Sequence, residues 1–328
     1  EEFSHSKVRN FGAEKATGEY LMFTVQDAIP IGERLIYFMI KTIKESGTVV
    51  VTCRQIPRAD ADLYACASLW NHYRTLKLDE DKILKHSHIN SLSPIEKRMM
   101  CQLDSVCFLI KKVPFMKFKF NETLKYAEDL DLGFRLTKNG YSIAFLAREG
   151  VIHSHNRHPL YYLKRSYVDN EILAKILGSD TQKIEMLPLL QALSIVYSSL
   201  NSSVKNIRSL GVEEPRKFIE YIKILGRKNL NQANNYTDGP LAEFFQILVK
   251  LNKPTNVNNE IIEKVLMAFE HHLNLLHEFL EYYTPSSLEE VESAIYKAFS
   301  TIAGSLIANA FGNGPEIEEI KRYLGEGV

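Results

Sequence analysis

The sequence has little cysteine, no net charge and no long apolar run, and each shortage argues against a class of protein. Four cysteines in 328 residues, without the paired close spacing of a zinc site, exclude a disulfide framework. Forty basic and forty acidic side chains leave no excess charge for nucleic-acid phosphates, so we expect no nucleic-acid partner. No run reaches the roughly 18 apolar residues of a membrane span. These shortages favour a cytoplasmic protein with reduced thiols.

The length predicts about two domains, and the two halves of the chain differ in their apolar periodicity. In the first half, short apolar runs predict strands at residues 20–25, 48–53, 105–110, 141–146 and 151–152. Helical patterns lie between them at residues 7–16, 33–45, 61–73 and 127–138. Strands that alternate with helices predict an α/β layered sheet.

Beyond about residue 160 only helical patterns remain. We expect a buried or interfacial helix at 187–200 and amphipathic helices at 215–226, 240–251, 259–283 and from 287 towards 311. The sequence therefore predicts an α/β domain over residues 1–165 and an all-α helical domain over 166–328.

Polar residues follow the first predicted strand. Gln26 and Asp27 stand where open α/β sheets place ligand-binding groups. An Asp at this position is a candidate ligand for a divalent cation such as Mg²⁺. Taken alone, however, an Asp shortly before Pro30 is more typical of a turn or a helix N-cap than of a cation ligand.

An acidic group opens the predicted helix at 127–138. Glu128, Asp129 and Asp131 lie in its first turn, where carboxylates interact favourably with the helix dipole. A carboxylate held at a helix N-terminus is also a good candidate general base, because its position is defined. Both interpretations stay open at this point.

Three histidines, His153, His155 and His158, follow the last predicted strand within six residues. Such a cluster favours a metal or phosphate role. Alternate residues of an extended chain point the same way, so we expect His153 and His155 to face one site.

These groups occur in an order that resembles the family 2 glycosyltransferases of the GT-A, Rossmann-like fold, and their rhamnosyltransferase-like members in particular. Five segments carry the resemblance: residues 9–13 (RNFGA) with Gly18 and Glu19, 23–30 (FTVQDAIP), 54–57 (RQIP), 127–136 (AEDLDLGFRL) and 151–155 (VIHSH). The helical half carries no motif of this family.

The resemblance implies a metal-dependent, inverting glycosyltransferase. Asp27 and His153 would bind the Mg²⁺ or Mn²⁺ that bridges the diphosphate of a nucleotide-sugar donor. Asp129 would be the general base that takes the proton of the acceptor hydroxyl, and Glu128 would support it.

The resemblance also implies further contacts. Arg9, Asn10 and Gln26 would bind the donor, although a surface salt bridge explains Arg9 equally well. The residues that would line the donor or acceptor pocket are Arg54, Gln55, Asp131 and His155.

The best donor by resemblance is dTDP-rhamnose, with UDP-galactose or GDP-mannose nearly as good. The acceptor would be a glycan or lipid-linked saccharide in bacterial surface polysaccharide synthesis. Val25 stands where the first Asp of the family's DxD motif is common, which leaves one direct carboxylate ligand.

The family's nucleotide-binding strands precede the segment that begins at Arg9, and we expect the GT-A domain here to be incomplete at its N-terminus. A non-catalytic binding or scaffold protein built on this incomplete domain is therefore the alternative. The helical half is a candidate for homo-oligomer formation, for peripheral membrane contact or for holding a lipid-linked acceptor, and its sequence does not choose among these.

Overall fold

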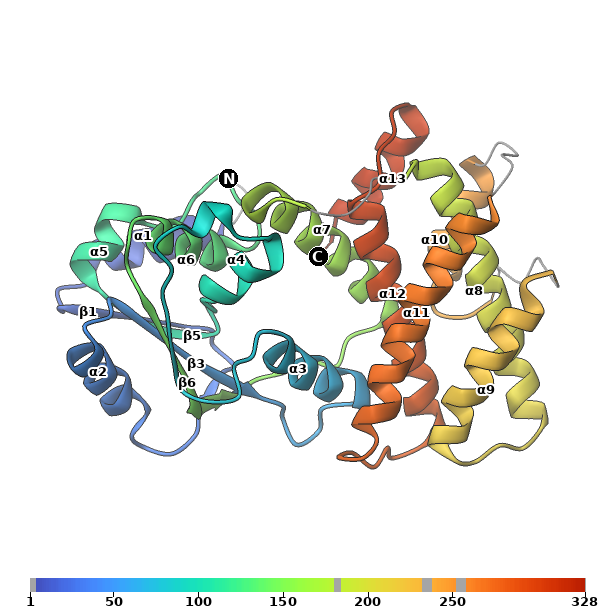
Figure 1. The fold of residues 1–328 in the computed structure, drawn as a ribbon, viewed down its shortest axis with the longest axis horizontal. Coiled ribbons are helices and arrows are strands. Elements are labelled where there is room, and N and C mark those ends of the chain that lie inside the picture. Colours follow the sequence, from blue (N-terminus) through green and yellow to red (C-terminus); the bar gives the residue numbers. More distant parts are fainter. Residues whose placement is uncertain (1–3, 180–183, 232–237, 252–257, 328) are drawn as a thin grey trace. The chain divides into compact units, whose positions relative to one another are not determined.

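A computed structural model of the chain describes residues 4–179, 184–231, 238–251 and 258–327 (Figure 1). The chain divides into two compact units, which are described separately. The first unit comprises Glu1–Ala61, Ser68–His155 and Ile172–Asp180. The second comprises Asp62–Ala67, Asn156–Glu171 and Thr181–Val328.

One mixed sheet of six strands forms the centre of the first unit. Its order is β1-β5-β3-β6-β2, with β4 also paired to β6. Only β3 and β6 run parallel, and the other pairs are antiparallel. The strands are β1 (Tyr20–Thr24), β2 (Ile29–Pro30), β3 (Val50–Ile56), β4 (Lys82–Leu84), β5 (Cys107–Lys111) and β6 (Ile143–Ile152).

Helices cover both faces of this sheet (Figure 1). Strand β5 shows why, because Phe108 and Ile110 pack into one apolar cluster and Cys107 and Leu109 into another. This alternation is the period of two of a β-strand that is buried on both faces. The helices that lie wholly in the first unit are α1 (His5–Lys15), α2 (Leu35–Ser46), α4 (Pro94–Met100), α5 (Lys112–Phe118) and α6 (Glu128–Lys138), with a 3₁₀ turn at Ile89–Ser91. The first residues of α3 (Leu63–Thr75) belong to the second unit and the rest to the first.

Apart from turns and one isolated β-bridge between Glu185 and Phe311, the described residues of the second unit are helical. Its helices are α7 (Pro159–Leu177), whose residues from Ile172 onward belong to the first unit, α8 (Met186–Ser209), α9 (Pro215–Lys228), α10 (Ala242–Leu251), α11 (Asn259–Phe279), α12 (Leu288–Ala308) and α13 (Pro315–Gly325), with a 3₁₀ turn at Asn229–Asn231. The predicted fold class, a Rossmann-like α/β domain followed by an all-α part, is confirmed. Helix α7 runs through residues 165 and 166, where the sequence predicts the domain boundary.

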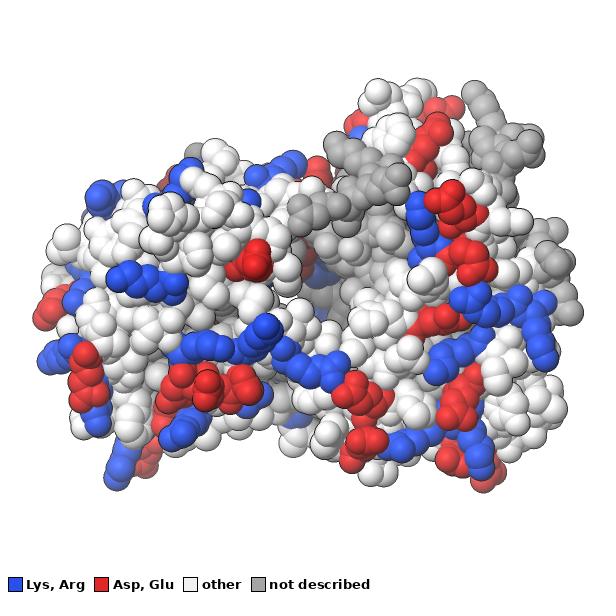
Figure 2. Space-filling view, viewed as in Figure 1, with Lys and Arg blue, Asp and Glu red and all other residues white. Residues whose placement is uncertain are grey.

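The visible face of the helical unit carries charges of both signs in close alternation (Figure 2). Within this unit Arg227 pairs with Glu263 and Glu270 across α9 and α11, at 2.8 and 2.5 Å. None of the described helices is long and apolar enough to cross a membrane. The cytoplasmic location and the peripheral membrane contact stay predictions.

Gly133 sets how closely α6 approaches the segment before β5. A Cβ at this position would collide with the carbonyl oxygen of Cys101 and lie 3.1 Å from the Cβ of Leu103. Since real Cβ atoms do not approach a backbone oxygen that closely, only glycine allows this packing. The glycine therefore helps to place the acidic first turn of α6.

We expect Gly133→Ala to lower the free energy of unfolding by about 1–3 kcal/mol, because the methyl group has to push α6 away from Cys101. Gly12→Ala in α1 is the matched control. A Cβ there meets nothing within 4 Å, and alanine should add up to about 1 kcal/mol through its helix propensity. Urea unfolding of both variants measures the difference, and equal stabilities would contradict the packing argument.

Candidate metal and carboxylate site

Asp27 lies in a short turn that is fixed on both sides by the sheet. Before it, the Val25 amide donates to the Val106 carbonyl at 3.2 Å, and the Ala28 amide closes the turn on the Val25 carbonyl at 3.3 Å. After it, β2 pairs with the end of β6. The turn therefore holds the Asp27 carboxylate beside the residues that follow β6.

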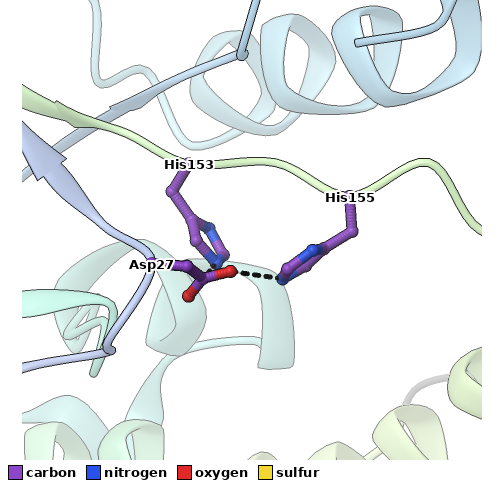
Figure 3. Close-up of side chains that lie close together, drawn as sticks. All are labelled: Asp27, His153 and His155. Carbon is purple, nitrogen blue, oxygen red and sulfur yellow. Dashed lines mark ion pairs between the residues drawn. The ribbon is translucent and has the colours of Figure 1, made fainter. Parts of the chain in front are cut away.

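His153 and His155 come from the segment directly after β6. The His153 amide donates to the Ile56 carbonyl at 2.9 Å, which extends the parallel pairing of β3 and β6. The buried Ser154 hydroxyl accepts from the Arg58 amide at 3.0 Å, so Ser154 points inward. The histidines on either side of it point together towards Asp27, as the alternation predicts (Figure 3).

The three side chains form one compact cluster. His153 Nε2 lies 3.7 Å from Asp27 Oδ1, and His155 Nε2 lies 3.4 Å from Asp27 Oδ2. One ligand atom from each residue lies within 4.8 Å of the others. The His153 side chain is only 13% exposed, against 37% for Asp27 and 42% for His155, so the cluster opens to solvent on one side.

Burial lowers the pKa of His153 although the Asp27 charge opposes the shift. The imidazole is therefore held neutral, the form that binds metal ions. By ligand type and spacing, one carboxylate and two imidazoles can hold a divalent cation.

The predicted acids lie at the start of α6. Glu128 is buried and forms an ion pair with Arg9. Asp129 Oδ2 accepts from the Ser105 amide at 2.7 Å, and its Oδ1 accepts from the Leu130 amide at 2.8 Å. Burial, followed by the charge of Asp129, raises the pKa of Glu128 even though Arg9 opposes the shift.

A third carboxylate, Asp104, was not expected from the sequence. It lies just before β5, where its Oδ1 accepts from the Val106 amide at 3.0 Å and its Oδ2 accepts from the Gln55 side-chain amide. Burial, with the nearby charge of Asp129, raises the pKa of Asp104 from its ordinary value near 3.8 to about 6. The sequence offered one sign of this carboxylate, the polar pair Asp104-Ser105. That pair precedes an apolar strand, whereas the predicted metal ligands follow one.

Comparison with known proteins supports the motifs. No family model matches the chain. It is 25% identical over 167 residues to the O-antigen chain rhamnosyltransferase WbaN of Salmonella anatum, which covers 51% of each chain. It is 26% identical over 170 residues to the O-antigen chain rhamnosyltransferase RfbN of Salmonella typhimurium, again over 51% of each. The predicted resemblance to rhamnosyltransferases is confirmed.

The chain spans about half the length of the curated relatives it matches. Among solved structures, residues 1–349 of S. aureus TarS align with 82% of this chain and 71% of that one, at 13% identity and a TM-score of 0.35. The same TarS segment in complex with UDP gives a TM-score of 0.33 at 13% identity, with 75% and 70% covered. At these scores the likeness carries no argument.

Two residues of the rhamnosyltransferase-like motifs are engaged in internal contacts. The buried Asn10 amide exchanges hydrogen bonds with the Phe120 backbone at 3.0 Å and donates to Glu122 at 2.9 Å. Asp131 pairs at 2.7 Å with Arg135 one turn later. Asn10 thus holds α1 against the segment after α5, and Asp131 orients Arg135, which donates to the carbonyls of Phe118 and Lys119. Their predicted roles in binding the donor and lining the pocket stay predictions.

Two other motif residues, Gln26 and Gln55, adjoin the cluster. Gln26 is exposed beside Asp27. The Arg54 guanidinium lies over the Tyr73 ring, 5.1 Å from its centre. Gln55 contacts His153 directly, since its Oε1 lies 2.8 Å from His153 Nδ1.

Asp104 makes stability depend on pH. Its folded pKa is above its unfolded value, so the native state holds the proton more tightly and stability should fall as pH rises from about 4 to about 6. The loss is at most about 3 kcal/mol for a shift of this size. Asp104→Asn should lack this loss, because an amide does not titrate. Unfolding in urea across pH 4–7 with a chelator present measures it.

The exposed Asp79 provides the control, because Asp79→Asn should follow the wild-type pH profile. A profile of Asp104→Asn that runs parallel to the wild type would show that Asp104 does not titrate in this range.

Proposed function

We propose that this chain carries the catalytic and acceptor-side part of a metal-dependent, inverting glycosyltransferase. It would transfer a sugar, with rhamnose from dTDP-rhamnose as the best candidate, to a glycan or lipid-linked acceptor in bacterial surface polysaccharide synthesis. The observation that carries the proposal is the cluster of Asp27, His153 and His155, held within 4.8 Å on the segments with rhamnosyltransferase-like motifs. The names of both relatives support the sugar and the pathway class.

In this proposal Asp27, His153 and His155 bind Mg²⁺ or Mn²⁺. His155, which the sequence placed in the pocket, becomes the third ligand because its Nε2 lies as close to Asp27 as that of His153. Two imidazoles favour Mn²⁺, because Mg²⁺ prefers oxygen ligands. When bound, the cation supplies positive charge that stabilises the leaving diphosphate.

Asp129 would act as the general base. It takes the proton from the acceptor hydroxyl while the hydroxyl oxygen attacks the anomeric carbon and the bond from that carbon to the diphosphate breaks. The attack from the opposite face inverts the anomeric configuration. The Ser105 and Leu130 amides orient the carboxylate, and each oxygen keeps a lone pair for the proton.

Arg9 would act through Glu128, because one nitrogen of its guanidinium pairs with that carboxylate. Gln26 is the best candidate for a donor contact, since it is exposed and adjoins Asp27.

Metal binding is tested by thermal unfolding of the full-length protein with Mn²⁺ and a nucleoside diphosphate. We expect Mn²⁺ and the diphosphate together to raise the melting temperature, because they bind only the folded state. Asp27→Ala should abolish the increase and His155→Ala should reduce it, while Asp79→Ala should retain it. The same increase in Asp27→Ala as in the wild type would remove the metal site from the proposal.

Catalysis is tested by sugar transfer from a panel of nucleotide sugars, with the product's anomeric configuration read by NMR. Asp129→Asn should lower kcat by about 10²–10⁴-fold, the usual contribution of a general base. Asp79→Asn should transfer at the wild-type rate. A wild-type protein that turns over no donor of the panel would favour the non-catalytic scaffold, and an unaffected Asp129→Asn would remove the assigned base.

A further inference from the structure

The side chains of Asp104, Gln55 and His153 form a continuous hydrogen-bond relay behind the Asp27 cluster. Asp104 accepts from the side-chain amide of Gln55, and Gln55 Oε1 lies 2.8 Å from Nδ1 of His153. The Gln55 backbone is fixed as well, because its amide donates to the Tyr73 hydroxyl at 2.6 Å. Each link joins residues that are far apart in the sequence.

The direction of each hydrogen bond in this relay follows from its buried end, Asp104. In its ionised form the Asp104 carboxylate only accepts hydrogen bonds, as it does from the Val106 backbone amide at 3.0 Å. The group of Gln55 that faces it is then the NH₂, which leaves Oε1 facing the imidazole. An oxygen in that place accepts, so His153 Nδ1 carries the proton.

We propose that Asp104 and Gln55 are positioning residues that hold His153 in its Nδ1–H tautomer, with the Nε2 lone pair directed at Asp27. The inference rests on the proposed function, because the lone pair is useful only if the Asp27 cluster binds a cation. Outer hydrogen bonds commonly fix the tautomer of metal-binding histidines in this way.

The resulting geometry suits a cation. His153 Nε2 and Asp27 Oδ1 lie 3.7 Å apart, and in this tautomer both atoms are acceptors with no proton between them. Two facing acceptors repel one another unless a positive charge lies between them. A tautomer with the proton on Nε2 would instead donate towards Asp27 and block the site.

The relay also adjoins the proposed base. Asp104 precedes Ser105, whose backbone amide donates to Asp129 at 2.7 Å. Asp104 therefore orients a proposed metal ligand, His153, through Gln55. The next residue, Ser105, orients the proposed base directly.

Asp104→Asn tests the relay by reversing its polarity. The Val106 amide still requires an acceptor, so the side-chain oxygen of the introduced asparagine takes that place and its NH₂ faces Gln55. Gln55 must then turn its oxygen to the asparagine and its NH₂ to His153. We therefore expect the imidazole proton to move to Nε2 and the affinity for Mn²⁺ to fall by roughly 10–100-fold.

A double variant supplies the rescue. With Gln55→Glu added to Asp104→Asn, the introduced glutamate accepts both from the introduced asparagine and from His153, and the net charge equals that of the wild type. The Nδ1–H tautomer and most of the Mn²⁺ affinity should return. A merely structural role for Asp104 would not predict that a second substitution restores them.

The tautomer is read from the imidazole ¹⁵N shifts of the metal-free protein, with His153→Gln used to assign the signals, and Mn²⁺ affinity is read by electron paramagnetic resonance. Retention of Nδ1–H in Asp104→Asn, unchanged Mn²⁺ affinity in that variant, or no recovery in the double variant would each overturn the inference. Failure of the wild type to bind Mn²⁺ would refute the metal site of the proposed function, whereas the metal-free tautomer would still decide whether the relay exists.

Discussion

The whole candidate site depends on the hydrogen bonds that residues 104–106 make just before β5. The Asp104 carboxylate holds Gln55, the Ser105 amide holds Asp129, and the Val106 carbonyl accepts from Val25 in the turn that carries Asp27. Because β5 is paired on both edges, by β1 and by β3, this segment cannot shift without disturbing the sheet. Burying the Asp104 carboxylate costs stability, which its two amide hydrogen bonds partly offset.

The parallel pairing of β3 with β6 explains why motifs about a hundred residues apart meet. Parallel strands end at the same edge of a sheet, so Gln55 at the end of β3 lies beside His153 just past the end of β6. Strand β1 also ends at this edge, because β1 and β3 are both antiparallel to β5, and Asp27 follows β1 there.

The sequence predicted the parts of this arrangement that depend on local pattern. The apolar runs of β1, β3 and β5 and the acidic start of α6 were found because period and composition are visible within a few residues. Helix α5 was missed because it has seven residues and contains Pro114. Strand β6 was read as two strands because residues 148–150 (REG) interrupt its apolar run, at the point where its pairing with β3 also shifts. Asp104 was missed because its importance comes from a contact 49 residues away in sequence, which no local pattern contains.

The proposed metal ligands differ from the two carboxylates of the DxD motif. In the proposed site the position of a second carboxylate is taken by Val25, and His155 supplies the third ligand atom instead. One carboxylate and two neutral imidazoles leave a bound divalent cation with a net charge near +1, whereas two carboxylates would cancel it. A site that keeps positive charge attracts a diphosphate more strongly, and this effect is greatest where surrounding protein excludes water. Replacing a carboxylate by an imidazole therefore shifts affinity from the free ion towards the ion bound to its diphosphate, which is the species that the proposed transfer requires.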